Sequence, residues 1–230
     1  MRTLSYILLS SLILLQPVMS LAQQTGDKKN VVTGNILDFR GISVSTDILG
    51  YAYTLLEDYM SGEVAIEANL GNKYYPVFEM GYGTCDFTDE TFGISYKSGA
   101  PYYRIGLNYN FSNKIGEAPR NSYIYALGRF AFTRAKYDVC TPPIHDPVWG
   151  GEVSLDLTDV NGYYSWAEFG VGVNVKIWKN LRMGWSIRYK ARLNQVTGNN
   201  SRMWYVPGFG NSRHTTFGGT YSIIYDIPFK

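Results

Sequence analysis

The stretch YYSWAEFGVGVNVKI, residues 163–177, alternates between two kinds of side chain with a period of two. Because successive side chains of a β-strand point to opposite faces, the stretch predicts a strand with one apolar and one polar face. The apolar face carries Phe169, Val171, Val173, Val175 and Ile177, and the other face carries Trp166, Glu168, Gly170, Gly172, Asn174 and Lys176. One such strand suits both a soluble sandwich and a membrane barrel, so the rest of the chain has to decide.

Other segments share this two-residue period, and no segment after about residue 41 shows a helical pattern. They cover residues 42–49, 62–70, 74–83, 102–111, 123–137, 181–193 and 221–229. The first of them has the weakest alternation. In the fifth, Tyr125 and Phe130 lie on opposite faces although both are apolar, which predicts a β-bulge near Gly128. Together with residues 163–177, these segments predict an all-β fold of eight antiparallel strands.

The connections between the predicted strands also differ in length. Those at 71–73, 112–121 and 178–180 tend to be shorter than the others, which are richer in Asp, Asn, Gly and Pro. Short turns at one rim and long loops at the other are typical of outer-membrane barrels, and an even strand number puts both termini on the periplasmic side. We therefore expect residues 41–230 to form an eight-stranded antiparallel transmembrane β-barrel in the bacterial outer membrane, with its long loops extracellular.

The carboxyl-terminal strand supports this expectation. Its apolar stripe continues to the end of the sequence, through Tyr221, Ile223, Tyr225, Ile227 and Phe229. In a soluble protein a core would have to cover such a stripe. In a barrel the stripe faces lipid, and pairing of the last strand with the first leaves no open edge.

The amino terminus has the features of an export signal. Residues 1–22 combine the basic Arg2, an apolar run over residues 4–15, and the small residues Ser20 and Ala22. The apolar run is shorter than the roughly 20 residues that span a bilayer, so we predict cleavage rather than anchoring. Residues 23–40 are then expected to form a periplasmic segment ahead of the barrel.

Three stretches resemble a known family. EVAIEANLGNKYYPVFEMGYG (63–83), YYRIGLNYNF (102–111) and IPFK (227–230) resemble a family of small, largely uncharacterised outer-membrane β-barrel proteins of Bacteroidota-type bacteria. The resemblance covers most of the mature chain. Because its motifs are structural, it implies a fold and a location but no catalytic residue.

The polar faces of the predicted strands place a set of charged side chains in the lumen. They are Asp47, Glu63, Glu67, Glu79, Arg104, Arg129, Glu168, Lys176, Arg182, Arg188, Lys190, Arg192 and Asp226. One interpretation is a charged conduit or anion site, and the other is a plug of paired charges; the narrow interior of eight strands favours the plug. Lys190 and Arg192 are also candidates for contact with lipopolysaccharide phosphates.

The cysteines and the charge balance limit the remaining chemistry. Cys85 and Cys140 follow the third and fifth predicted strands, and in an oxidising compartment they are expected to form a disulfide across neighbouring loops. The spacing of histidines and cysteines predicts no metal site, and no phosphate-binding loop predicts a cofactor. Without the basic signal peptide the chain is nearly neutral, which gives no support for a nucleic-acid partner.

Catalysis has weak support in the sequence. The chain has two histidines, of which His145 lies in a loop and His214 stands near Ser212 and Thr216, a faint sign of a base beside a hydroxyl. The loop before the last strand also places aromatic side chains outside the predicted membrane span. Met203, Trp204, Tyr205 and Phe209 mark either a binding surface or a strand that continues beyond the membrane.

These features predict a non-catalytic outer-membrane barrel that is a structural or accessory component of a larger complex, such as assembly or transport machinery. Its expected partners are outer-membrane lipid, lipopolysaccharide and other membrane proteins. The alternatives are a lipid-modifying enzyme and a small channel.

Overall fold

The structure, a computed structural model, describes residues 38–53, 59–115, 117–145, 150–154, 156–198 and 202–228. The predicted signal peptide at 1–22, most of the predicted periplasmic segment and Phe229 lie outside these residues. Within them, no helix has the length and apolar character needed to cross a membrane.

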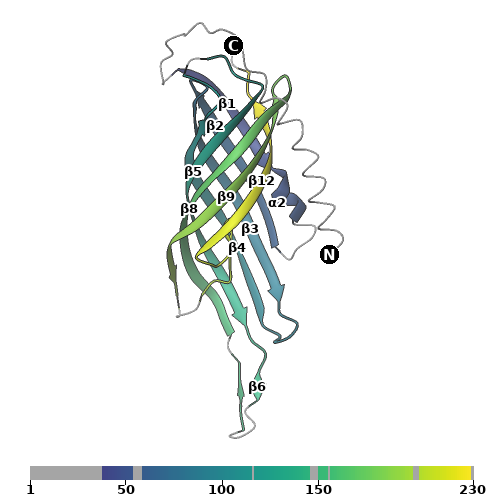
Figure 1. Ribbon diagram of the computed structural model, residues 1–230. Helices are drawn as coiled ribbons and strands as arrows, with labels where there is room; N and C mark the ends of the chain where they lie inside the picture. The colour runs from purple at the N-terminus through teal and green to yellow at the C-terminus, as the bar shows by residue number, and fades with distance from the viewer. Residues whose placement is uncertain are drawn as a thin grey trace. The chain divides into compact units, whose positions relative to one another are not determined.

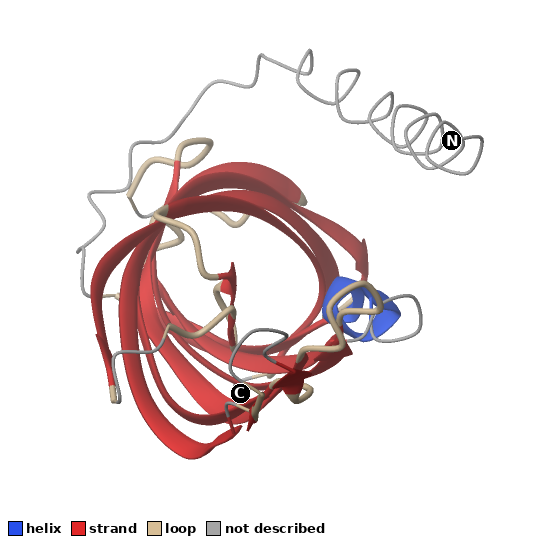
Figure 2. Ribbon diagram, turned by 90° about the horizontal axis from the view of Figure 1, so that it is seen from below, coloured by secondary structure: helices blue, strands red, loops and turns tan. Residues whose placement is uncertain are grey.

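Eight antiparallel strands close into a barrel, as predicted (Figures 1 and 2). In chain order they are β1 (Phe39–Asp47), β2 (Tyr59–Leu70), β3 (Tyr74–Thr88), β4 (Ser95–Asn110), β5 (Ser122–Cys140), β8 (Asp156–Trp178), β9 (Leu181–Thr197) and β12 (Thr215–Asp226). Each strand pairs with its sequence neighbour in the wall, and β12 pairs with β1. The fold is therefore a meander whose last strand completes the ring.

Among the described residues, four short strands and one helix are not part of this ring. They are the pairs β6 (Ile144–His145) with β7 (Glu152–Val153) and β10 (Tyr205–Val206) with β11 (Gly210–Asn211), and the helix α2 (Ile48–Tyr53). The β6–β7 pair continues the long strands β5 and β8 past the rim (Figure 1). The other end of the barrel carries the short turns.

The pairing register gives the tilt of the strands. A path around the barrel can be traced from each residue to the one directly opposite on the next strand. It starts at Tyr225 on β12, passes through Val44 and Ile66, and returns to β12 at Thr215. The path therefore comes back ten residues away from its start. This stagger in an eight-stranded barrel corresponds to a strand tilt of about 40°, within the range of outer-membrane barrels.

The predicted bulge near Gly128 is wrong. The β4–β5 and β5–β8 registers run through Gly128 without a shift, and the irregularity in β5 lies between Tyr137 and Val139. Tyr125 is buried and Phe130 is exposed because they occupy opposite faces of a regular strand. The prediction failed because it assumed that every aromatic side chain of this strand faces lipid.

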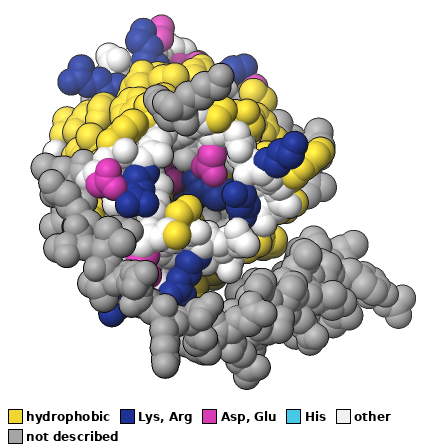
Figure 3. All heavy atoms as spheres, turned by 90° about the horizontal axis from the view of Figure 1, so that it is seen from above, with side chains coloured by type: hydrophobic (Ala, Val, Ile, Leu, Met, Phe, Trp, Pro, Cys, Tyr) yellow, Lys and Arg dark blue, Asp and Glu magenta, His cyan; other side chains and the backbone are white. Residues whose placement is uncertain are grey.

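The barrel is apolar outside and charged inside. The exposed fractions of Ile105, Phe169 and Ile187 are 60%, 60% and 66%, whereas those of Glu79 and Glu168 are 2% and 0%. Viewed onto the short-turn end, charged side chains gather in the mouth and hydrophobic side chains surround it (Figure 3). An apolar exterior around a charged interior is the inverse of a soluble domain and matches a barrel whose wall faces lipid.

The first predicted strand differs from the structure at its end. β1 stops at Asp47, and residues Ile48–Tyr53 form α2 instead of continuing the strand to Leu49. The Oδ1 atom of Asp47 accepts a hydrogen bond from the backbone N–H of Leu49 at 3.1 Å, as a helix-capping carboxylate does. β1 is consequently shorter than both strands beside it.

The predicted disulfide does not form in the structure: no disulfide joins Cys85 and Cys140. Cys85 lies on β3 opposite Ser98 of β4, and Cys140 lies on β5 opposite Ser95 of β4. Two strand spacings and a three-residue offset separate the cysteines by about 14 Å. A disulfide needs Cα atoms within about 7 Å, so the continuation of both strands past the predicted loops keeps the thiols apart.

Candidate functional site in the barrel lumen

Six of the predicted lumen residues meet at the middle of the barrel, one from each of six strands. We call this group the central cluster; it consists of Glu63, Glu79, Arg104, Arg129, Glu168 and Arg188. Glu79 is the hub, because its carboxylate lies 3.1 Å from Arg104, 3.1 Å from Arg129 and 3.0 Å from Arg188. A single buried carboxylate therefore ties together three strands besides its own.

The other two carboxylates complete the charge balance. Glu168 lies 2.9 Å from Nε of Arg104 and 3.3 Å from Nη1 of Arg188, and Glu63 pairs with Arg104. Three carboxylates thus face three guanidinium groups, and the cluster carries no net formal charge. Buried ions are tolerated when they are paired and their remaining donors are hydrogen-bonded, a condition that Arg129 meets through Asn108 at 2.7 Å.

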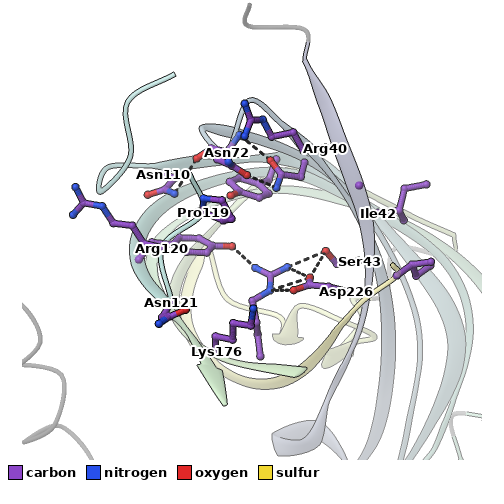
Figure 4. A pocket seen from close by; sticks show the side chains of 16 residues that line it. Arg40, Ile42, Ser43, Asn72, Asn110, Pro119, Arg120, Asn121, Lys176 and Asp226 are labelled. Atoms are coloured by element: carbon purple, nitrogen blue, oxygen red, sulfur yellow. Dashed lines mark hydrogen bonds and ion pairs between the residues drawn. The ribbon is translucent and has the colours of Figure 1, made fainter. Parts of the chain in front are cut away.

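A second charged group lies nearer the short turns. Arg182 reaches Oδ1 of Asp226 at 2.6 Å and donates to Oγ of Ser43 at 2.9 Å and to the hydroxyl of Tyr123 at 2.5 Å. Glu67 lies 3.6 Å from the same guanidinium group. These groups face a cavity of about 420 Å³ at the short-turn mouth, and Figure 4 shows Ser43 and Asp226 in its wall.

The remaining predicted residues lie outside these two groups. Lys176 lines the short-turn mouth, and Asp47 accepts backbone hydrogen bonds at the end of β1. Arg192 lies against His214 and Gln195 near the opposite rim. Lys190 donates to backbone carbonyl groups rather than to a carboxylate. The structure thus brings nine of the thirteen predicted residues into two groups and leaves four outside them, of which Lys190 lies beside the central cluster, directly opposite Glu168.

The segment between β9 and β12 folds back into the barrel. We call residues 202–213 the lid. The prediction placed its aromatic residues outside, but Met203 and Phe209 are buried, with exposed fractions of 1% and 2%. The ring of Phe209 packs against Tyr164 and Trp166, with centroids 5.0 and 5.7 Å apart. The sequence left open a binding surface or a strand that continues beyond the membrane, and neither describes these two residues.

Two further aromatic residues of the lid stack on the inner wall. Trp204 stacks on Tyr96 with ring centroids 5.7 Å apart, and Tyr205 stacks on Tyr59 at 5.6 Å. Burial raises the pKa of the Tyr205 phenol above its usual range, so this side chain stays neutral at physiological pH. The lid is therefore held by ring packing along both of its sides.

The lid also bonds to the charged lumen. The carbonyl oxygen of Gly208 accepts hydrogen bonds from Nη2 of Arg104 at 2.9 Å and from Nζ of Lys190 at 2.8 Å. Gly208 has a φ of +79°, and a Cβ atom there would lie 2.5 Å from the ring of Tyr102. A close backbone approach to the cluster therefore requires glycine at this position.

Two cavities lie on either side of the central cluster. The second has a volume of about 740 Å³ and lies under the lid, with Glu63, Arg104 and Lys190 in its wall. No residue lines both cavities. Glu79, Arg129, Glu168 and Arg188 line neither, so these side chains form the partition between them.

The geometry does not assemble the hydrolytic pair that the sequence hinted at. The ring nitrogens of His214 lie 2.7 and 3.0 Å from Nη2 of Arg192, and the hydroxyl of Thr216 donates weakly to the carbonyl of Phe217 at 3.5 Å. The side chain of His145 lies outside the described residues. Among the residues that the structure describes, no group of three metal-ligating side chains is close enough to hold a metal ion.

Several lumen residues were missed in the sequence because they are aromatic. Tyr102 and Tyr125 point inward, where Tyr102 donates to Glu63 at 3.0 Å. Each lies directly opposite a glycine, Gly81 for Tyr102 and Gly172 for Tyr125, and its ring covers that glycine. Pairing of a large residue with a small one is the signal that could have placed them inside.

Comparison with solved structures gives matches at low identity. A major outer membrane protein from Thermus thermophilus has a TM-score of 0.49 and 11% identity, covering 82% of this chain and 100% of that one. The attachment invasion locus protein Ail of Yersinia pestis has 0.40 and 10%, covering 81% and 98%. CarO of Acinetobacter baumannii has 0.41 and 11%, covering 84% and 100%. At these values the likeness extends to the fold alone.

Sequence comparisons give one family. No curated protein matches the chain at a significant level. A family model described as "Domain of unknown function (DUF6048)" matches residues 3–230, nearly the whole sequence. The chain therefore belongs to the DUF6048 family.

Proposed function

We propose that the chain is a non-catalytic barrel of the bacterial outer membrane, closed to solutes across its middle, that acts as a structural or accessory component of a larger outer-membrane complex. The observation that carries the proposal is the partition between the two cavities, formed by four interlocked charged side chains. Such a partition suits a wall and a scaffold better than a conduit, because passage of a solute would require buried ion pairs to separate.

The apolar exterior supports the location. A closed barrel whose outward side chains form an apolar band has no stable place in water, and lipid is the environment that it fits. We place the short turns and both termini on the periplasmic side and the end of the barrel that holds the lid on the extracellular side, as is usual for barrels of this kind.

The accessory role is supported by the part of the molecule that projects from the barrel. β5 and β8, with 19 and 23 residues, are the longest of the described strands, and the β6–β7 pair extends them past the rim (Figure 1). We call the described residues 138–145, 150–154 and 156–158 the projecting hairpin. Its surface neither lines the lumen nor belongs to the lipid-facing wall, so it is available to a partner.

Cell fractionation and affinity purification test the proposal together. The tagged chain is expected in the outer membrane, with heat-modifiable migration on a gel, and to bring a membrane-protein partner with it in mild detergent. Shortening the projecting hairpin to a tight turn is expected to remove the partner and keep the heat-modifiable barrel. The control variant shortens residues 89–94, the turn between β3 and β4. Recovery of the wild-type chain as a soluble periplasmic protein would contradict the location, and partner retention after loss of the hairpin would contradict its role.

A further inference from the structure

The barrel wall is complete only along the length of β1. This strand ends at Asp47, opposite Ser222 of β12, but β12 continues from there to Thr215. On the other side, Val64 is the last residue of β2 that pairs with β1, opposite Thr46, and β2 continues beyond it to Tyr59. Where β1 is missing, the edges of β2 and β12 are two strand spacings apart, about 10 Å. We call this opening in the described wall the lateral gap; it lies between residues 215–221 and residues 59–63.

The helix α2 covers part of the gap from outside (Figure 2). A Cβ atom on Gly219 would lie 3.8 Å from Leu49, and one on Gly62 would lie 3.0 Å from the ring of Tyr51, so the helix touches both edges. Asp47 links the helix to β12, because its carboxylate accepts hydrogen bonds from the backbone N–H groups of Leu49 and Tyr221. Six helical residues are about 9 Å long, whereas the unpaired part of β12 is about 20 Å long. The described helix therefore covers about half of the gap.

The cavity under the lid reaches this gap. Its wall includes five consecutive residues of β12, from Thr216 to Thr220. Thr216 and Thr220 point into the lumen and Gly218 lies on the same face, whereas Phe217 and Gly219 lie on the lipid-facing side. Because residues of both faces line it, the cavity extends to the unpaired edge of β12. The volume of about 740 Å³ lies within the usual range for small-molecule sites.

The chemistry of the cavity changes along its length. At the outer end, Phe217 is 76% exposed and Gly219 has no side chain, so this part is apolar and open. At the inner end Nζ of Lys190 donates to the carbonyl oxygens of Gly208 and Phe209, at 2.8 and 3.4 Å. No carboxylate of the described residues lies within ion-pair distance of this ammonium group. Since an ammonium group has three donors, one remains for an anion.

We propose that the lateral gap and the cavity behind it bind an amphiphile that has an anionic head, a carboxylate or a phosphate, and a single acyl chain. The head binds Lys190, and the acyl chain leaves the barrel through the part of the gap that the described helix does not cover, past Phe217, into the bilayer. Within the part of the chain that the structure describes, the length of gap that α2 leaves uncovered admits one acyl chain. This inference rests on the membrane location proposed above and adds a ligand to a barrel otherwise closed at its middle.

Blocking the gap tests the path of the chain. Binding of radiolabelled palmitate to the purified full-length barrel in a non-ionic detergent is measured for Gly219→Leu, whose side chain extends over the gap between Leu49 and Phe217. The matched control is Gly128→Leu, which adds the same side chain to the lipid-facing side of β5, where a Cβ atom meets nothing within 4 Å. We expect saturable binding at one site, weakened at least roughly tenfold by Gly219→Leu and unchanged by Gly128→Leu. Absence of saturable binding, or equal affinity in both variants, overturns the inference.

Removing the charge tests the head. Lys190→Met keeps the length of the side chain and is expected to weaken palmitate binding roughly tenfold or more, the usual effect of one charge-assisted hydrogen bond. Hexadecanol, with the same chain and no charge, is expected to lose no affinity. Palmitate has a carboxylate head and lysophosphatidylglycerol a phosphate head, so comparing them separates the two kinds of anion. The head that the site prefers is the one whose ligand binds more tightly and loses affinity in Lys190→Met. Lys190-independent binding of both contradicts the site.

Failure of this inference is distinguishable from failure of the proposed function. Heat-modifiable migration and outer-membrane fractionation report on the barrel whether or not it binds palmitate. If the folded membrane barrel binds no amphiphile, only the proposed ligand site is contradicted. If the chain is soluble, the ligand site and the proposed membrane location are both contradicted.

Discussion

At the scale of single residues, Glu79 is the side chain on which the lumen depends most. It contacts three guanidinium groups that have only two other carboxylates nearby. We predict that Glu79→Gln, which keeps the shape and removes the charge, lowers the free energy of unfolding by about 3–5 kcal/mol, because it leaves buried positive charge uncompensated. Urea unfolding in vesicles measures the change. Glu90→Gln, in an exposed turn, is the control, and an equal effect of both substitutions contradicts the central role of Glu79.

Close packing of tyrosine on glycine gives a second prediction at this scale. A Cβ atom on Gly81 would lie 2.3 Å from the ring of Tyr102, whereas one on Gly128 meets nothing within 4 Å. Gly81→Ala is expected to lower the free energy of unfolding by about 1–3 kcal/mol, the usual effect of overpacking. Gly128→Ala is expected to change it little. Equal stabilities in the same urea assay would mean that the tyrosine ring is not seated on the strand.

The sequence predicted individual lumen charges well because alternation alone assigns each residue of a strand to a face. Glu168 and Arg188 follow from counting in twos along strands that carry an unbroken apolar face. The inward position of Tyr125 does not follow in this way, because an aromatic ring suits lipid and lumen alike. The residue opposite it on the neighbouring strand determines which face it occupies. The pairing register that identifies Gly172 as this partner is a property of the closed barrel and cannot be read from one strand.

At the scale of elements, the lid is the part that the sequence described least well. Its residues have neither a two-residue period nor a helical one, so they predict a loop and say nothing of where it folds. The deciding contact is between Gly208 and two side chains of the lumen, Arg104 and Lys190, which are far from it in sequence. By contrast, the capping Asp47 ahead of α2 was a local signal for a helix, and it could have been used.

Gly208→Ala tests how the lid is held. The substitution strains a backbone with φ of +79° and drives a Cβ atom into the ring of Tyr102, so the lid is expected to detach. Trypsin, which cleaves after Arg202 and Arg213, should then cut at least roughly tenfold faster while the barrel keeps its heat-modifiable migration. Gly210→Ala shares the positive φ, of +104°, but meets nothing within 4 Å. If both variants are cut at one rate, the ring contact does not hold the lid.

At the scale of the whole molecule, the inverted distribution of apolar and charged side chains implies lipid around the wall. Ile105→Arg places a charge on this surface and is expected to lower the free energy of unfolding in vesicles by about 2–4 kcal/mol, as at the middle of other barrels. Phe92→Arg, in the exposed turn between β3 and β4, is expected to stay within about 0.5 kcal/mol. If Ile105→Arg is tolerated as well as Phe92→Arg, water rather than lipid surrounds the wall.

The proposed barrier to solutes is the set of paired charges between the two cavities of the lumen. Electrical recording from the purified barrel in a planar lipid bilayer tests it most directly, with a porin added afterwards to show that the bilayer reports insertion of an open channel. Orientation in the bilayer does not matter, because the partition blocks both directions. We expect no conductance above the baseline of the bilayer for the correctly folded, heat-modifiable protein. A steady ohmic conductance that scales with the amount of inserted protein would contradict it.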